Sequence, residues 1–202
     1  MTKKKLQMTI PLVALLVIAA AAILYYQLVI SNPKSQEFHI HTNFAVYLNG
    51  VQYNFNQTKY MEDESNPLSA LIHIHDMNGG VVHIHQDGFT LGTFFQSIGI
   101  KLNSTCFTLD IGAAYCNSGS STLKFYVNGQ QSSLYDNYRF SDLDKILITF
   151  GNDSQQTIQQ QMSSIPSDAC IYSEKCQAPP GFVNTEEISC KTGEVSACTA
   201  PS

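Results

Sequence analysis

Apolar and polar residues alternate along several short stretches of the chain, with the period of two that is typical of β-strands. The stretch His39–Leu48 alternates in this way, and a second short stretch, Val51–Phe55, follows it after Asn49-Gly50. Asn-Gly favours a type I′ turn because both residues tolerate positive φ. The two stretches therefore predict a β-hairpin.

The chain continues up to residue 151 with further short elements and turns. We expect a second hairpin, a helix, a third hairpin and a buried strand, in that order, over Leu71–Gln86, Leu91–Ile98, Leu123–Gln131 and Asp144–Gly151. Thr90 can cap the N-terminus of the helix, and Gly99 can end it. The third hairpin contains another Asn-Gly turn, at Asn128.

These elements predict an α+β domain with one mostly antiparallel sheet and one short helix, in a β-grasp-like arrangement. A single transmembrane helix is expected before this domain. A Cys-rich tail tied by disulfides is expected after it, with a short Gln-rich helix over Ser154–Ser163. The predicted boundaries are a cytoplasmic stub at 1–9, a membrane anchor at 10–30, a linker at 31–37, the domain at 38–151 and the tail at 152–202.

The stretch Ile10–Ile30 contains no charged residue and is long enough for a membrane-spanning helix, which needs roughly 20 apolar residues. Lys3–Lys5 precede it and favour a cytoplasmic N-terminus. The alternative is a signal peptide cleaved within Ala19–Ala22, but the apolar core of a signal peptide is about 7–15 residues long. We therefore expect a single-pass membrane protein whose domain lies outside the cell membrane.

Acidic residues dominate beyond this stretch. Three of the eleven Lys and Arg residues are Lys3–Lys5, and the other eight face sixteen Asp and Glu residues. The chain has no basic cluster there that could bind nucleic acid. The partners that we expect are the membrane, reached through the N-terminal helix, and a membrane protein.

Six cysteines follow the apolar stretch, an even number that predicts three disulfides in an oxidising compartment. They are Cys106, Cys116, Cys170, Cys176, Cys190 and Cys198. Cys106 and Cys116 are the expected local pair, and the last four cysteines allow three connectivities. Metal ligation by thiolates is the alternative, but it usually needs a tighter motif such as Cys-x-x-Cys, which the sequence lacks.

All histidines of the chain occur in three His-x-His pairs. They are His39, His41, His73, His75, His83 and His85. Because successive side chains of a strand point to opposite faces, each pair presents two imidazoles on one face and an isoleucine on the other. A solvated sheet surface gives imidazoles no reason to concentrate in this way, so the pairs indicate a site.

The turn of the second hairpin decides which histidines lie opposite each other. A two-residue Asn-Gly turn would pair His75 with Val82 and would split the histidines between the two faces. A three-residue turn, with its last glycine at positive φ, would pair His75 with His83. His73 would then lie opposite His85, and four imidazoles would share one face. We favour the three-residue turn.

Imidazoles at this spacing suit a transition-metal ion. Cross-strand Cβ atoms lie about 5 Å apart, and imidazole nitrogens bind metals such as copper and zinc at about 2 Å. We expect copper or zinc, bound by the histidines of the second hairpin and completed or duplicated by the pair of the first strand: His73, His75, His83, His85, His39 and His41. The alternatives are a pH-sensing histidine cluster and a solvated polar face.

Four stretches, "HIHTNFAVYLNG", "IHIHDMNGGVVHIH", "TLGTFFQSIG" and "FYVNG", carry a resemblance to a known family. Together they resemble small membrane-anchored His-x-His proteins of archaea, notably ammonia-oxidising ones, and of some bacteria. The resemblance extends over about residues 38–151, and His85 departs from it where the family pattern has a glutamate. The family has no established activity, so the resemblance implies an anchored His-rich domain and no particular reaction.

Three functions are compatible with these features. The first is capture or delivery of copper or zinc outside the cytoplasm, or an accessory role there. The second is a small metal-dependent hydrolase or hydratase that uses a metal-bound water, with Asp76 as its base. Since Asp76 follows His75 directly, its side chain is expected on the opposite face unless the turn twists it back. The third is an interaction protein with structural histidines, and we favour the first.

Overall fold

A computed structural model describes residues 15, 17–27, 38–63 and 65–182 of the chain. The chain divides into two compact units, 1–37 and 38–202. In the first unit, residues 15 and 17–25 are helical. Within the described part of the chain, no helix has the length and hydrophobicity that crossing a bilayer requires. The predicted stub at 1–9, the linker at 31–37 and parts of the predicted anchor lie outside the described residues.

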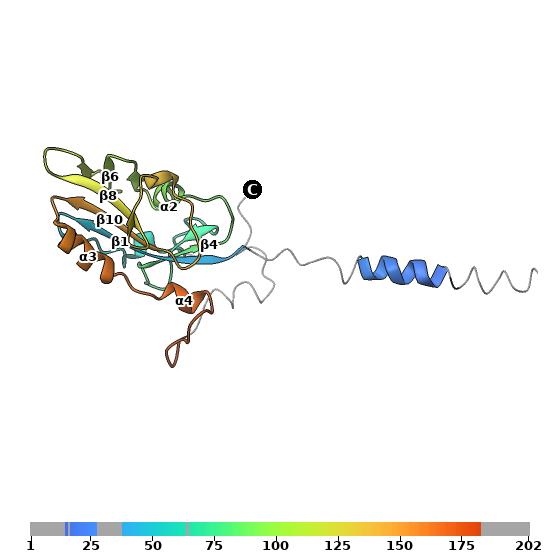
Figure 1. The fold of residues 1–202 in the computed structure, drawn as a ribbon. Coiled ribbons are helices and arrows are strands. Elements are labelled where there is room, and N and C mark those ends of the chain that lie inside the picture. Colours follow the sequence, from blue (N-terminus) through green and yellow to red (C-terminus); the bar gives the residue numbers. More distant parts are fainter. Residues whose placement is uncertain (1–14, 16, 28–37, 64, 183–202) are drawn as a thin grey trace, which may run out of the picture. The chain divides into compact units, whose positions relative to one another are not determined.

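The second unit is built on a mixed β-sheet with the strand order β3-β4-β1-β10-β8-β9, and β2 pairs with β1 (Figure 1). Its strands are β1 Ile40–Leu48, β2 Val51–Gln52, β3 Ile72–His73, β4 Val81–Ile84, β8 Thr122–Val127, β9 Gln130–Gln131 and β10 Lys145–Gly151. β1 and β10 run parallel in the middle, and the other pairs are antiparallel. The predicted α+β class with a mostly antiparallel sheet is confirmed, whereas the β-grasp-like arrangement stays a prediction.

A smaller three-stranded sheet and several short helices complete the unit. The strands are β5 Lys101–Leu102, β6 Cys106–Thr108 and β7 Ala114–Cys116. The helices are α2 Leu91–Ser97, α3 Gln155–Ser163, α4 Ala169–Tyr172 and the 3-10 turns η2 Thr58–Tyr60 and η3 Tyr135–Asn137. Thr90 caps α2 as predicted, because its side chain accepts a hydrogen bond from the Thr93 backbone N–H. The Gln-rich segment also forms the predicted helix, α3.

The Asn-Gly turns follow from local chemistry. Asn49 and Asn128 have φ values of 54° and 51°, and the glycines after them also have positive φ. This is the backbone that a type I′ hairpin turn needs, and asparagine and glycine adopt it at low cost. Both predicted Asn-Gly hairpins are therefore present.

The two faces of the main sheet pack against different elements. On one face Phe44 and Ile148 join Phe94 and Phe95 of α2 in the main hydrophobic core. On the opposite face Ala45, Leu147 and Tyr126 pack against Ile158 of α3. Figure 1 shows α2 and α3 on opposite sides of the central strands. A residue of β1 therefore contacts the main core or the α3 side according to its position along the strand.

The segment after residue 151 was expected to be a disulfide-tied tail, and its described part packs against the sheet. Ala169 and Tyr172 of α4 are buried together with Val81 of β4. A disulfide joins Cys170 to Cys176 and closes the loop that follows α4. Cys190 and Cys198 lie outside the described residues. Residues 152–182 thus contribute buried surface to the same unit as the histidines.

Candidate metal centre

The histidine strands have one apolar face and one imidazole face. Ile72, Ile74 and Ile84 are almost completely buried in the main core, and Ile40 packs against it. The alternating histidines project to the other face, on the side of α3 and α4. The apolar packing of the isoleucines therefore fixes the direction in which the imidazoles point.

The predicted register of the second hairpin is wrong. His73, and not His75, lies opposite His83 in the pairing of β3 with β4. On the other side of β4, His83 lies opposite His41 of β1. The actual register differs from the predicted one by two residues, and a shift of two keeps each side chain on its original face. The prediction therefore placed the histidines at the wrong positions along the sheet but on the correct face.

The reason for this register is the position of the turn. The Asn78 backbone N–H donates to the His75 carbonyl at 3.0 Å, and the two residues between them, Asp76 and Met77, both have positive φ. The expected turn residue Gly80 does not have positive φ. The chain thus turns at Asp76 and Met77 and again at Gly79 and Gly80, where the Val81 N–H donates to the Asn78 carbonyl at 3.3 Å. The reversal is centred on Asn78 instead of Gly79, and His73 therefore pairs with His83.

The six imidazoles form one continuous closed array, which we call the histidine cluster. Going round it, neighbouring ring centroids are 4.5 Å (His39–His41), 4.8 Å (His41–His83), 4.0 Å (His83–His75), 5.4 Å (His75–His73), 5.1 Å (His73–His85) and 4.4 Å (His85–His39) apart. All six histidines predicted as metal ligands are thus in a single contact network. Three separate segments of the chain contribute two histidines each.

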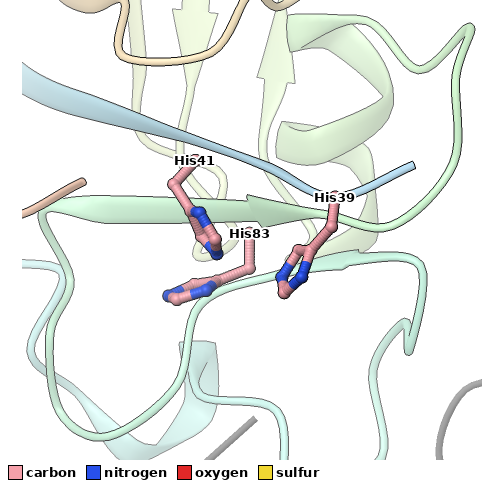
Figure 2. Close-up of side chains that lie close together, drawn as sticks. All are labelled: His39, His41 and His83. Carbon is pink, nitrogen blue, oxygen red and sulfur yellow. The ribbon is translucent and has the colours of Figure 1, made fainter. Parts of the chain in front are cut away.

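Three members of the cluster approach the spacing of metal ligands. One ring nitrogen from each of His39, His41 and His83 lies within 4.8 Å of the other two. Figure 2 shows the three rings gathered from neighbouring strands. His41 and His83 are buried, whereas His39 is exposed and gives this group contact with solvent. These three residues are able to hold a metal ion.

A chain of hydrogen bonds holds the His41 ring. His41 Nδ1 lies 2.8 Å from Ser173 Oγ, and Ser173 Oγ donates to Asp142 Oδ1 at 2.7 Å. Because the single hydroxyl proton of Ser173 is directed to Asp142, His41 Nδ1 is the donor to Ser173. The lone pair of the neutral ring then lies on Nε2. Lys175 also binds the Asp142 carboxylate.

Two more histidines are held in the same way. His73 Nδ1 lies 2.8 Å from the Ser69 carbonyl oxygen, which can only accept a hydrogen bond. His75 Nδ1 lies 2.9 Å from Asp76 Oδ2. The turn therefore brings Asp76 back to the cluster, which is the exception to the expected opposite face. An imidazole that donates through Nδ1 to a carbonyl or carboxylate presents Nε2 for a metal, which is the usual arrangement of histidine ligands.

Tyr172 of α4 covers part of the cluster. Its ring packs edge-on against His83, with centroids 4.6 Å apart, and it also contacts His41 and His75. The Asn78 amide donates to the Tyr172 hydroxyl at 3.4 Å. The short helix after the sheet therefore shields one side of the cluster from water.

Two carboxyl groups near the cluster have shifted pKa values. Burial raises the pKa of Glu62, and the nearby charges of His75 and His85 act in the opposite direction. Burial also acts to raise the pKa of Asp142, but hydrogen bonds from the His41 backbone and from the C-terminal loop outweigh it and lower the pKa. Both groups therefore belong to the electrostatic surroundings of the histidines.

Sequence patterns did not identify four of these residues, which are Glu62, Asp142, Tyr172 and Ser173. The chain around Met61 forms a parallel bridge with Ile74, which places Glu62 beside the strand segment between His73 and His75. The last two residues lie within the short loop closed by Cys170 and Cys176. The close spacing of these cysteines was the available signal that this segment has a fixed shape.

Comparisons with known proteins provide no family for this chain. No family model, no curated protein and no solved structure matches it at a significant level.

Proposed function

We propose that this protein binds copper or zinc at the histidine cluster. The observation that supports this proposal best is the closed array of six imidazoles, in which the ring nitrogens of His39, His41 and His83 come within 4.8 Å of one another. The Nδ1 hydrogen bonds of His41, His73 and His75 add support, since they direct Nε2 lone pairs away from the supporting groups. We infer that the protein captures the metal ion, delivers it, or has an accessory role.

We further propose that the site lies outside the cytoplasm on a membrane-anchored protein. Two disulfides, Cys106–Cys116 and Cys170–Cys176, occur among the described residues, and disulfides persist in oxidising compartments. The uncharged stretch Ile10–Ile30, preceded by lysines, supports an anchor with a cytoplasmic N-terminus. The resemblance to anchored His-x-His proteins agrees with this location and remains part of the proposal.

The position of Asp76 favours binding over hydrolysis. Its carboxylate contacts His75 Nδ1 and therefore orients a histidine. A general base must instead face the water or substrate from which it takes a proton. The hydrolase or hydratase function with Asp76 as its base stays a prediction, as does the role of the C-terminal segment in binding a membrane partner.

The test is the metal content of the full-length protein, purified in mild detergent and dialysed against copper or zinc. The wild type is expected to retain at least one equivalent per chain. His41→Asn combined with His83→Asn is expected to retain at least one equivalent less than the wild type, because these residues form the buried part of the group. Gln52→Ala combined with Gln131→Ala, two exposed strand positions, is the matched control. Folded wild-type protein that retains neither metal would disprove the proposal.

A further inference from the structure

The histidine cluster contains more ligands than one ion uses. Zinc in proteins is almost always four-coordinate, and catalytic sites commonly have three protein ligands. His39, His41 and His83, the first group, can supply three nitrogens. His73, His75 and His85, the second group, remain. Their presence in the same array needs an explanation beyond a single ion.

The rings of the second group contact one another, although among the described residues only the first group has ligand atoms that all lie within 4.8 Å of one another. His73 contacts both other members of the second group, with ring centroids 5.4 Å from His75 and 5.1 Å from His85. His73 and His75 are buried, and each has its Nδ1 engaged by an oxygen acceptor. Both rings therefore have the tautomer in which Nε2 is the ligand atom.

A carboxylate lies beside the same histidines. The Glu62 backbone N–H donates to the Ile74 carbonyl at 2.8 Å, which places Glu62 next to the strand segment between His73 and His75. Burial raises the pKa of Glu62, and the charges of His75 and His85, both members of the second group, act to lower it. Carboxylate oxygen completes many histidine sites for zinc.

Negative charge near the cluster is concentrated on the side of the second group. The Asp142 carboxylate, which supports His41 in the first group, already binds the Lys175 ammonium. Asp76 contacts His75, and the backbone hydrogen bond from Glu62 to Ile74 places Glu62 between His73 and His75 along the strand. Two neighbouring divalent ions repel each other, and these carboxylates would reduce that repulsion.

We propose that the cluster binds two metal ions, the second one through His73, His75 and His85 with the Glu62 carboxylate as the fourth ligand. This inference rests on the proposed function. His85 stacks on His39 with centroids 4.4 Å apart, and His75 contacts His83 at 4.0 Å. The two groups therefore border each other.

The experiment is a copper(II) titration of the full-length protein, followed by metal analysis and electron paramagnetic resonance. The wild type is expected to bind two equivalents, and the second equivalent is expected to add a dipole-coupled signal. Glu62→Gln is expected to weaken the second equivalent by at least about tenfold while leaving the first unchanged. Asp63→Asn, an exposed neighbour whose carboxylate accepts hydrogen bonds from Ser65, is the matched control and is expected to keep both equivalents.

The outcomes separate this inference from the proposed function. One equivalent in the wild type, with the signal of isolated copper, would overturn the second site and leave the first standing. Equal affinities of wild type and Glu62→Gln for both equivalents would also overturn it, since the carboxylate would then not be a ligand. Protein that binds no copper or zinc at all would contradict both proposals.

Discussion

His41 Nδ1 lies 2.8 Å from Ser173 Oγ, although 132 positions separate the two residues in the chain. Ser173 belongs to the loop after α4, and its hydroxyl donates a hydrogen bond to Asp142. The loop thus fixes the tautomer of a histidine on the first strand. This contact connects the C-terminal segment directly to the proposed metal centre.

Removing the Ser173 hydroxyl is expected to weaken metal binding without unfolding the protein. In Ser173→Ala, His41 loses the acceptor that orients its ring, and such supporting groups contribute about 10–100-fold to metal affinity. The measurement is zinc affinity by competition with a chromophoric chelator. Ser163→Ala, an exposed serine at the end of α3, is the control. Equal zinc affinities for Ser173→Ala and Ser163→Ala would contradict this role.

The Cys170–Cys176 disulfide is expected to support the metal centre, whereas the Cys106–Cys116 disulfide is not. The first closes the loop that carries Ser173, and the second joins β6 to β7 of the smaller sheet. Replacing either pair by serines is expected to cost about 2–3 kcal/mol of unfolding free energy.

Zinc affinity distinguishes the two disulfide variants. We expect a loss of roughly tenfold or more for the Cys170/Cys176 variant and wild-type affinity for the Cys106/Cys116 variant, both measured on protein verified as folded by circular dichroism. A similar loss of zinc affinity in both variants would show that each loss results from lower stability of the whole domain.

Gly79 is expected to tolerate no side chain. A Cβ there would lie 2.5 Å from the Phe55 carbonyl carbon, and the Gly79 N–H donates to Asn56 Oδ1 at 2.6 Å. Gly79→Ala is expected to destabilise the protein by about 1–3 kcal/mol because the backbone must move. At Gly80 the nearest atom to a Cβ is a Pro166 side-chain carbon at 3.3 Å, so Gly80→Ala is expected to cost clearly less. Urea denaturation measures both, and equal losses would contradict the prediction.

Asp110 is expected to make the free energy of unfolding depend on pH. Its carboxylate accepts hydrogen bonds of 2.6 Å from both Lys59 and Tyr60. Burial acts to raise the pKa of Asp110, but these two bonds outweigh it and hold the pKa below its usual value. Since the folded pKa is the lower one, the stabilisation is complete above the ordinary carboxyl pKa near 3.9 and is lost as the pH falls through the folded value.

Asp110→Asn tests this dependence. We expect a loss of up to about 1 kcal/mol at pH 7, because the pair is partly exposed, and a smaller difference from wild type near pH 2.5. Urea denaturation at the two pH values gives the comparison, with the exposed Asp87→Asn as control. A difference from wild type that is the same at both pH values would argue against a charged role for Asp110.

Features set by neighbouring residues could be predicted from the sequence. The Thr90 cap, the turns at Asn49 and Asn128 and the Cys106–Cys116 pair each depend on residues a few positions apart. The alternation of histidine and isoleucine also identified the shared face, because the period of a strand is fixed. These local rules gave the sheet class and the location of the six histidines on one surface.

Features set by distant contacts could not be predicted. The β3–β4 register depends on a turn at Asp76 and Met77, and methionine has no local preference for positive φ. The bridge between Met61 and Ile74 constrains this strand from another part of the chain. For the same reason, no pattern indicated that Ser173 would reach His41.

The isoleucines between the histidines are buried in an apolar core that involves no metal ligand. A zinc finger, by contrast, folds only when its ion is present. Here the buried isoleucines stabilise the strands without a metal. The metal-free and metal-bound proteins are therefore expected to have the same fold. Loading and release would then be limited by ligand exchange and by passage beside the exposed His39. Under the proposed function, the protein would then bind and release one ion after another without refolding.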